Sequence, residues 1–414
     1  MADPSLTLAT WLASTDGQAA LAEAAELAPW SDPLAASTAL ARSRPDLTPE
    51  QARAALAQAD LAHAARTRHG RPDADRLLFT RDGLEQGTRA EVAELRARTL
   101  ASSGVRHVVD LTAGLGLDAR AFATAGLRVT AVERDPHVAA LLAHNLRGTD
   151  SEVIVADALD VAPPLLASLD PTDAVFVDPA RRDPVGARDL STGRARAERD
   201  PARWSPPLPA VLALPHPRIV VKAAPATAVP DGWQAQWTSV QRTVVECSLW
   251  SWPALPADRV AAVMRAPDEV TIVTPSGVPT PVAGQALSFV LEPDPALVAA
   301  GLLDALGDTA VSRLADDSTW LTSDHQPDGS IGDGRLRSVV RAYRVIDVLS
   351  GSTAQQRALL RSHGVTHAVV KSKDTGDAPA RVLGDLRLAE GGAHVIVVTR
   401  IAGRRLMLLT TPAS

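Results

Sequence analysis

The chain has 414 residues, enough for two or three domains with cores of their own. Hydrophobic residues make up 46% and charged residues 22%, a balance that excludes wholesale disorder. The single cysteine, Cys247, excludes a disulfide framework or a cysteine-clustered metal site, and it fits a reducing cytosol, so we expect a cytoplasmic protein. No apolar run reaches the roughly 18 to 20 residues that cross a bilayer, so we expect no membrane partner.

The formal net charge of −6 is unevenly distributed. Residues 335–414 carry 13 Lys and Arg against five Asp and Glu, a net charge of +8, and the rest of the chain therefore carries −14. A basic module on an acidic body is typical of nucleic-acid binding, because cations neutralise backbone phosphates. A solvated surface with uneven charge gives the same count, so the charge alone leaves both interpretations open.

Residues 1–76 predict helices, because apolar residues recur at helical spacing in 6–12 and 17–27. Thr48 followed by Pro49 and an acidic first turn predicts a helix start, and we expect this helix to run through about His69. Residues 70–73 then predict a linker.

From about residue 90, short β-rich runs alternate with helical stretches, the pattern of a parallel α/β sheet. The runs 107–111, 127–133, 153–156, 174–178 and 218–222 predict five crossover strands. Two further runs, 242–246 and 260–264, have no room for a helix between them. We therefore expect these two runs to pair antiparallel and to close a seven-stranded, Rossmann-like sheet.

The remaining segments divide into a long loop, a connecting region and a terminal unit. The loop 179–217 is too long for an ordinary connection, and its arginines near Trp204 suit a lid over a nucleic-acid strand or a partly disordered segment. The connecting region predicts a hairpin at 270–274 and 280–282, a helix at 295–303 and a linker at 326–334. The terminal α/β unit predicts strands at 338–345, 366–371, 394–400 and 405–410, and helices at 352–362 and 378–388.

The sharpest motif is the turn after the first strand. The strand ends in Asp110, and Gly114 and Gly116 then let the backbone approach a ligand before a helix begins. A dinucleotide fingerprint has a third glycine, where this chain has Ala119. Asp118 would repel a pyrophosphate at the helix start but suits the cationic end of an aminoacyl ligand, which favours S-adenosyl-L-methionine over a nicotinamide dinucleotide.

Three further acids follow the next three strands. Glu133 lies 23 residues after Asp110, close to the spacing at which an acid binds ribose hydroxyls. Asp157 follows the third strand, where the adenine edge is expected, and Asp178 ends the fourth. Because carboxyl strand ends meet at one edge of the sheet, these acids predict one site. We also assign to the cofactor site the neighbouring residues Thr112, Ala113, Arg134, Ala158 and, at the methionine end or alternatively as a helix cap, Gln86.

These motifs together resemble a class I S-adenosylmethionine-dependent methyltransferase over residues 78–265. The whole chain is similar to bacterial methyltransferases that end in a THUMP-like domain, a resemblance carried by Phe79-Thr80, residues 84–88, Asp178 to Arg182 and the terminal unit from about Arg341. The resemblance implies RNA, either tRNA or rRNA, as substrate. Together with the patterns above, it leads us to expect four parts: a helical region (1–76), a methyltransferase domain (77–265), a connecting region (266–334) and a THUMP-like RNA-binding domain (335–414).

Asp178 and Pro179 fit the motif that holds an exocyclic amine for methylation, since a side-chain oxygen and a backbone carbonyl both accept from the amine. Ala180 and Arg181 depart from that motif, which has a second proline and an aromatic residue. Arg181 would stack on a base or hold a phosphate, or would form a surface ion pair as Arg182 also would. We assign Arg182, Lys222, Arg341, Lys371 and Lys373 to substrate binding. The alternatives are a surface ion pair for Arg182, the cofactor carboxylate or a solvated strand end for Lys222, and an exposed turn for Lys371 and Lys373.

We therefore expect a metal-free RNA methyltransferase that transfers methyl directly to a base nitrogen. Methylation at pyrimidine C5 needs a thiolate, and Cys247 lies in an apolar strand, so we expect it to be inert. The histidines show no metal-ligand spacing. Two alternatives stay open: a methyltransferase acting on a protein or small molecule, and a non-catalytic RNA-binding protein that keeps the fold.

Overall fold

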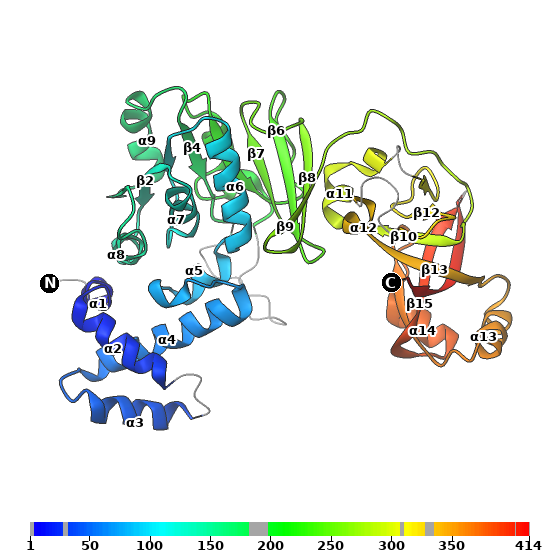
Figure 1. Cartoon of the computed structure of the whole chain (residues 1–414), viewed down its shortest axis with the longest axis horizontal. Coiled ribbons are helices and arrows are strands. Elements are labelled where there is room, and N and C mark those ends of the chain that lie inside the picture. The colour runs from blue at the N-terminus through cyan, green and yellow to red at the C-terminus, as the bar shows by residue number, and fades with distance from the viewer. Residues whose placement is uncertain are drawn as a thin grey trace. The chain divides into compact units, whose positions relative to one another are not determined.

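The computed structural model describes residues 4–27, 32–181, 198–306, 310–327, 335–401 and 403–413 (Figure 1). The chain divides into two compact units. The first unit contains Met1–Ala223, Val229–Gln234 and Ser248–Ala254, and the second contains Ala224–Ala228, Ala235–Cys247 and Leu255–Ser414. In the described parts of the chain, no helix is both long and apolar enough to cross a membrane.

Four helices begin the first unit and confirm the helical prediction for this region: α1 (Pro4–Leu12), α2 (Thr15–Glu26), α3 (Pro33–Ser43) and α4 (Pro49–His69). A capping box starts α4, because the Thr48 hydroxyl accepts from the Gln51 N–H at 3.2 Å and the Gln51 side chain accepts from the Thr48 N–H at 2.9 Å. Gly70 ends α4 in the left-handed conformation, with φ of 62°. Local sequence thus sets both ends of this helix.

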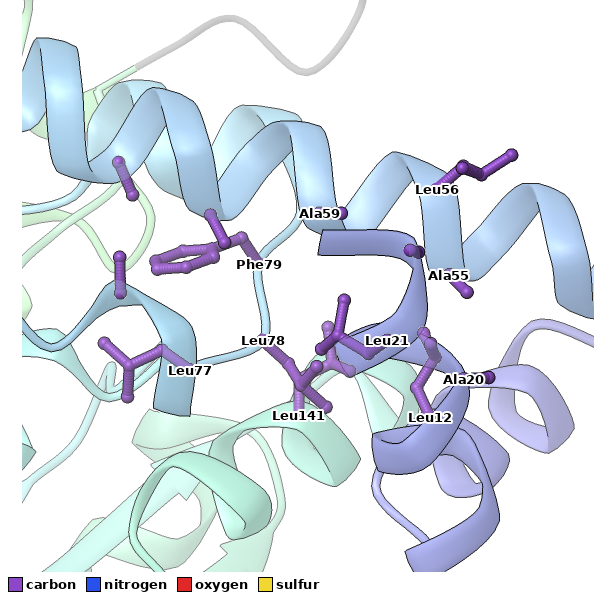
Figure 2. Packing of buried hydrophobic residues seen from close by; sticks show 14 of the residues in the cluster. Leu12, Ala20, Leu21, Ala55, Leu56, Ala59, Leu77, Leu78, Phe79 and Leu141 are labelled. Atoms are coloured by element: carbon purple, nitrogen blue, oxygen red, sulfur yellow. The ribbon is translucent and has the colours of Figure 1, made fainter. Parts of the chain in front are cut away.

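A shared hydrophobic core joins these helices to the rest of the first unit (Figure 2). Leu12 and Leu21 lie in the same buried cluster as Leu78, Phe79 and Leu141, the last of which belongs to α8 (Pro136–Asn145). Burying side chains of this size stabilises a fold by about 1.5 to 3 kcal/mol each. The N-terminal helices are therefore packed onto the sheet-bearing part of their unit.

Two side-chain amides hold the backbone of Leu78 and Phe79, which is buried outside any strand. Gln58 of α4 donates to the Phe79 carbonyl at 2.6 Å and accepts from the Phe79 N–H at 2.9 Å. Asn145 of α8 accepts from the Leu78 N–H at 2.7 Å and donates to the Leu78 carbonyl at 3.0 Å. Unpaired buried backbone groups are costly, so this segment depends on both amides.

A nine-stranded sheet follows, in the order β3-β2-β1-β4-β5-β7-β6-β8-β9. β1 pairs parallel with β2 and β4, β2 with β3, and β4 with β5, which confirms the five crossover strands. The elements are η1 (Ala74–Arg76), α5 (Arg81–Gln86), α6 (Ala90–Ser102), β1 (His107–Asp110), α7 (Leu117–Thr124), β2 (Arg128–Glu133), β3 (Ser151–Val155), α9 (Ala158–Ala167), β4 (Ala174–Val177), η2 (Pro201–Arg203), α10 (Leu208–Leu212), β5 (Ile219–Ala223), β6 (Gln234–Val240), β7 (Thr243–Trp250), β8 (Arg259–Ala266) and β9 (Glu269–Val273).

The expected count of seven strands is wrong, because β6 and β9 also belong to this sheet. β6 lies between β7 and β8, so the predicted antiparallel pairing of 242–246 with 260–264 does not occur. β6 is buried along its whole length yet contains Gln234, Gln236, Thr238 and Ser239, so its sequence lacks the apolar pattern of a buried strand. β9 pairs antiparallel with β8 rather than with 280–282.

The second sheet has seven strands in the order β11-β12-β10-β13-β16-β15-β14. The predicted terminal strands and helices are confirmed, except that residues 338 and 339 end a helix. Strands β10 to β12 in the connecting region were not predicted, because they are short and β10 contains Glu292 and Pro293. The elements are β10 (Phe289–Pro293), α11 (Pro295–Ala300), η3 (Leu303–Leu306), β11 (Ser312–Arg313), β12 (Leu321–Ser323), α12 (Arg335–Val339), β13 (Val340–Val348), α13 (Thr353–Ser362), β14 (His367–Ser372), α14 (Pro379–Leu386), β15 (Ala389–Ile401) and β16 (Arg404–Pro412).

The turn between β1 and α7 needs its glycines for two different reasons. Gly114 and Gly116 both have positive φ, at 54° and 77°. A Cβ on Gly114 would meet open space, whereas a Cβ on Gly116 would collide with the Leu142 side chain. Gly116 therefore combines left-handed backbone with close packing against α8.

We predict that Gly116→Ala lowers the stability of the protein more than Gly126→Ala does. Both positions have positive φ, but only Gly116 lacks room for a Cβ. The left-handed conformation costs about 1 kcal/mol for alanine, and overpacking adds about 1 to 3 kcal/mol. Urea unfolding of the two variants measures the difference, and equal losses would show that Leu142 moves aside without cost.

Candidate active site

The carboxyl ends of β1 to β4 border a cavity of about 590 Å³ in the first unit. Asp110 ends β1, Glu133 ends β2, Asp157 follows β3 and Asp178 follows β4, and all four line the cavity. The volume lies within the range of about 300 to 1,000 Å³ that is usual for small-molecule sites. The four acids from separate parts of the sequence thus converge at the edge of the sheet where open α/β folds bind ligands.

Most of the residues that the sequence assigned to the site lie around this cavity. Besides the four acids, its walls contain Gln86, Thr112, Ala113, Gly114, Asp118, Arg134, Ala158, Pro179, Arg181 and Lys222. Gly116 is absent from the walls and packs against α8 instead. Arg182 lies outside the described residues, and Arg341, Lys371 and Lys373 belong to the second unit.

Backbone donors of two loops orient the Glu133 carboxylate. The Gly114 N–H donates to Glu133 Oε2 at 3.0 Å, and the Asp135 N–H donates to Oε1 at 2.9 Å. Each carboxylate oxygen has a further lone pair, so both can still accept from the vicinal hydroxyls of a ribose. Open space beside Gly114 leaves room for a ligand at this turn. Asp157 is exposed and also caps α9, accepting from the Leu159 N–H at 3.0 Å.

Thr112 links the ends of β1 and β4. Its N–H donates to Asp110 Oδ1 at 3.1 Å, and its hydroxyl accepts from the Asp178 N–H at 2.7 Å. Asp110 is buried, and burial together with the nearby charge of Asp118 raises its pKa well above the usual range. The cavity floor therefore holds a carboxyl group that is hard to ionise.

A chain of polar contacts runs from Asp178 along one wall of the cavity. Lys222 Nζ lies 2.6 Å from Asp178 Oδ2 and donates to the Thr88 hydroxyl at 2.8 Å. The Thr88 hydroxyl donates in turn to Asp118 Oδ2 at 2.5 Å, and Asp118 Oδ1 pairs with Arg96. Lys222, Thr88, Asp118 and Arg96 are all buried. Buried charges are tolerated only when they are paired, so each group requires the next.

From the sequence, Asp118 was expected to face the cationic end of an aminoacyl ligand. Its carboxylate lines the cavity but already contacts Arg96 and Thr88. Arg96 also lies over the Phe176 ring, 4.9 Å from the ring centroid, and Arg71 donates to the Thr88 carbonyl at 2.6 Å.

Sequence reasoning missed Thr88, Arg96 and Arg71 as contributors to this site. Thr88 does belong to the segment 84–88 that carried the family resemblance, which was the only signal for it. The two arginines lie on segments that no spacing argument connects to the sheet edge.

The segment after Asp178 is held by a short bridge. Ala180 and Ser205 exchange backbone hydrogen bonds at 2.8 and 3.0 Å. The Arg181 guanidinium lies 5.9 Å from the centroid of the Trp204 ring, which is buried. Arg181 thus borders the cavity with its guanidinium near an aromatic ring. Of the loop proposed as a lid, residues 182–197, Arg182 among them, lie outside the described residues.

The two lysines assigned to substrate binding in the second unit contact one buried acid. Lys371 and Lys373 lie 2.9 Å and 3.1 Å from the Glu292 carboxylate, and the Tyr343 hydroxyl donates to it at 3.0 Å. Burial alone would raise the Glu292 pKa, but the hydrogen bond from Lys371 and the charges of both lysines outweigh it and lower the pKa from 4.5 to about 2. Both lysines therefore pair with an acid of β10 within the second unit.

Cys247 is buried in β7, and burial raises its thiol pKa to about 12, as expected for an inert cysteine. Within the residues that the structure describes, no group of His, Cys, Asp and Glu is arranged to hold a metal ion.

We predict that Thr88→Val destabilises the protein by about 1 to 3 kcal/mol, because Lys222 and Asp118 both lose a buried partner. Thr88→Ser keeps the hydroxyl and should lose under 1 kcal/mol. Thermal unfolding of the two variants tests this. Equal midpoints for valine and serine would show that the hydroxyl does not support the network.

A second prediction concerns acid stability. The pKa of Glu292 is lower in the folded protein than in the unfolded chain, where it is about 4.3. The ionised carboxylate and its lysine partners therefore stabilise the fold at pH values above about 4.3, and this stabilisation is lost as the pH falls toward about 2. The loss should be on the order of 3 kcal/mol. Urea unfolding at neutral pH and near pH 3 should show a smaller acid loss in Glu292→Gln than in the wild type. The exposed control Glu390→Gln should retain the wild-type pH dependence. The same dependence in all three proteins would contradict the role of Glu292.

Comparisons with known proteins agree with this geometry. Residues 78–179 match the family model "Putative SAM-dependent methyltransferase", and residues 340–412 match the model "THUMP domain-like". An uncharacterized S-adenosylmethionine-dependent methyltransferase of Mycobacterium tuberculosis H37Rv is 28% identical over 343 residues, which cover 80% of this chain and 87% of that protein. Ribosomal RNA small subunit methyltransferase J of Alkalilimnicola ehrlichii is 34% identical over 184 residues, covering 37% of this chain and 67% of that protein.

A crystal structure of a "putative methyltransferase" from Porphyromonas gingivalis W83 superposes with a TM-score of 0.69 at 20% identity. The match covers 96% of this chain and 99% of that one, so the two share a fold along their length. The expected cofactor, S-adenosylmethionine, is that of the matched family. Sequence, fold and site together show that the chain belongs to the S-adenosylmethionine-dependent methyltransferases, with a THUMP-like domain at its C-terminus.

Proposed function

We propose that this methyltransferase acts on RNA, either tRNA or rRNA, and that it methylates a base nitrogen by direct transfer. The observation that carries the RNA assignment is the 34% identity to a ribosomal RNA small subunit methyltransferase. The THUMP-like match and the net charge of +8 over residues 335–414 support it. We assign the protein to the cytoplasm, and we retain the four-part division at 1–76, 77–265, 266–334 and 335–414.

The cavity residues fit S-adenosylmethionine. Glu133 is oriented to accept from the ribose hydroxyls, and the open space at Gly114 admits the aminoacyl end close to the backbone. We assign Asp157 to the adenine, and Asp110 and Asp118, which also line the cavity, to the rest of the cofactor. When bound, the cofactor supplies an electrophilic methyl group on a sulfonium. The remaining chemistry consists of holding and orienting the acceptor.

We assign Asp178 and Pro179 to hold that acceptor. Lys222 fixes Asp178 Oδ2, and no described residue donates a hydrogen bond to Oδ1, which is therefore available to an exocyclic amine. The Pro179 carbonyl provides a second acceptor at the same edge of the cavity. Hydrogen bonds from both amine protons to these oxygens turn the nitrogen lone pair toward the methyl group. Arg181 borders the same space and is available to a base or a phosphate.

We predict that Asp178→Ala reduces methyl transfer at least about 100-fold, because positioning of the acceptor is lost. The assay measures radiolabel passing from S-adenosylmethionine to total RNA from a strain that lacks the protein. Asp60→Ala, which removes an exposed carboxylate from α4, should retain wild-type activity.

Nucleoside digestion of the labelled RNA then identifies the methylated atom. Absence of label in RNA, with label in protein or in a small molecule, would refute the RNA assignment. Label on a carbon or on a ribose oxygen would refute the assignment to a base nitrogen.

A further inference from the structure

A second pocket, of about 430 Å³, lies entirely within the second unit. It shares no lining residue with the methyltransferase cavity. Four arginines contribute to its walls, namely Arg242, Arg265, Arg337 and Arg341. No acidic residue lines it among the described residues. The sequence analysis assigned only Arg341 to substrate binding, and neither the family models nor the relatives assign this pocket.

Arg265 builds one wall of the pocket. From the end of β8, its guanidinium donates to the carbonyls of Arg337, Ser338 and Val340 at 2.5, 2.7 and 3.1 Å. These carbonyls belong to the junction of α12 and β13, so Arg265 fixes the backbone that bears Arg337 and Arg341. Burial lowers the Arg265 pKa most, the charges of Arg242 and Arg341 lower it further, and the charges of Glu269 and Asp294 oppose this shift.

Arg242 enters the pocket from a strained turn. Gln241 and Arg242 connect β6 to β7 and both have left-handed φ, 48° and 64°, which a tight hairpin turn normally assigns to asparagine or glycine. Non-glycine residues in this conformation cost about 1 to 3 kcal/mol each and mark functional positions more often than chance. Arg242 Nη2 donates to the carbonyls of Glu292 and Pro293 at 3.2 and 3.0 Å. Its Nη1 is buried and has no hydrogen-bond partner.

Of the four arginines in the pocket, only Arg242 has a described carboxylate within ion-pair distance. Glu292 lies 3.6 Å from Arg242, but Lys371 and Lys373 already bind the same carboxylate. Across the described ranges, no carboxylate lies within ion-pair distance of Arg265 or Arg341. Arg337 and Arg341 are exposed. An anion entering the pocket would therefore meet the guanidinium groups of Arg337 and Arg341, which have no described carboxylate within ion-pair distance.

We propose that this arginine pocket binds phosphate groups of the RNA backbone. Guanidinium forks match the oxygens of a phosphodiester, and several arginines along a shallow pocket suit consecutive phosphates. Phosphate contacts set the position of an RNA without reading its bases. The inference rests on the proposed function and deepens it, because it locates the RNA contact at these arginines rather than at Lys371 and Lys373.

The test compares RNA binding by full-length variants. Arg337→Gln/Arg341→Gln removes two exposed arginines of the pocket, and Arg361→Gln/Arg381→Gln removes two exposed arginines from α13 and α14 of the same unit. The probe is deproteinised tRNA and rRNA from a strain that lacks the protein. Dissociation constants are measured between about 50 and 200 mM salt, the range in which phosphate contacts change affinity most clearly. Thermal midpoints verify that both variants fold.

We expect the pocket variant to bind RNA at least about tenfold more weakly at low salt, with a logarithmic salt dependence reduced by about 1 to 2. The control variant should differ from the wild type by less than about twofold. Wild-type affinity in the pocket variant, or equal losses of affinity in both variants, would refute the proposal that this pocket binds RNA.

Methyl transfer to RNA, measured on the same proteins, separates this inference from the proposed function. Labelled RNA with unchanged binding in the pocket variant refutes the pocket and leaves the function standing. Weaker binding in that variant, combined with no RNA label in the wild type, supports RNA binding by the pocket and refutes RNA as the methyl acceptor. A wild type that binds no RNA refutes the pocket.

Discussion

The active site depends on the pairing of charges that are buried beneath its cavity. Lys222 and Asp118 would each be costly alone, and the Thr88 hydroxyl joins them by donating to one and accepting from the other. Arg96 completes the pairing of Asp118, and Lys222 in turn fixes one oxygen of Asp178. The orientation of Asp178 thus depends on Lys222 of β5, whose own partner Thr88 precedes the sheet in the sequence. The methyltransferase sheet alone does not contain all the groups that its site requires.

This dependence gives the N-terminal helices a structural role. Gln58 and Asn145 hold the backbone of Leu78 and Phe79 between α4 and α8, a few residues before Thr88. The hydrophobic cluster of Figure 2 fixes the same segment from its other side. Removing these helices would release the segment that carries Thr88 to Arg96. Residues 1–76 therefore belong to the support of the cavity, even though none of them lines it.

Local sequence patterns correctly predicted the helices and strands whose formation depends on neighbouring residues. Apolar β-branched runs identified β1 to β5, and Thr48 with Pro49 located the start of α4. The convergence of Asp110, Glu133, Asp157 and Asp178 follows from the rule that parallel strands end at one edge. β6 was missed because its buried residues are largely polar, so that its stability comes from sheet pairing rather than from an apolar pattern. The Thr88 network was missed because only the folded chain brings its members together.

The pairing of charged side chains also could not be predicted from the sequence. A net of +8 over the terminal residues suggested a basic surface, and Lys371 and Lys373 looked equivalent to Arg341. In the fold, the lysines neutralise Glu292, whose lowered pKa records that pairing. Arg341 instead lies with arginines from β8 and from the β6–β7 turn, both outside the terminal segment. Net charge counts cations without their partners, whereas the fold decides which cations lie beside a carboxylate and which gather without one.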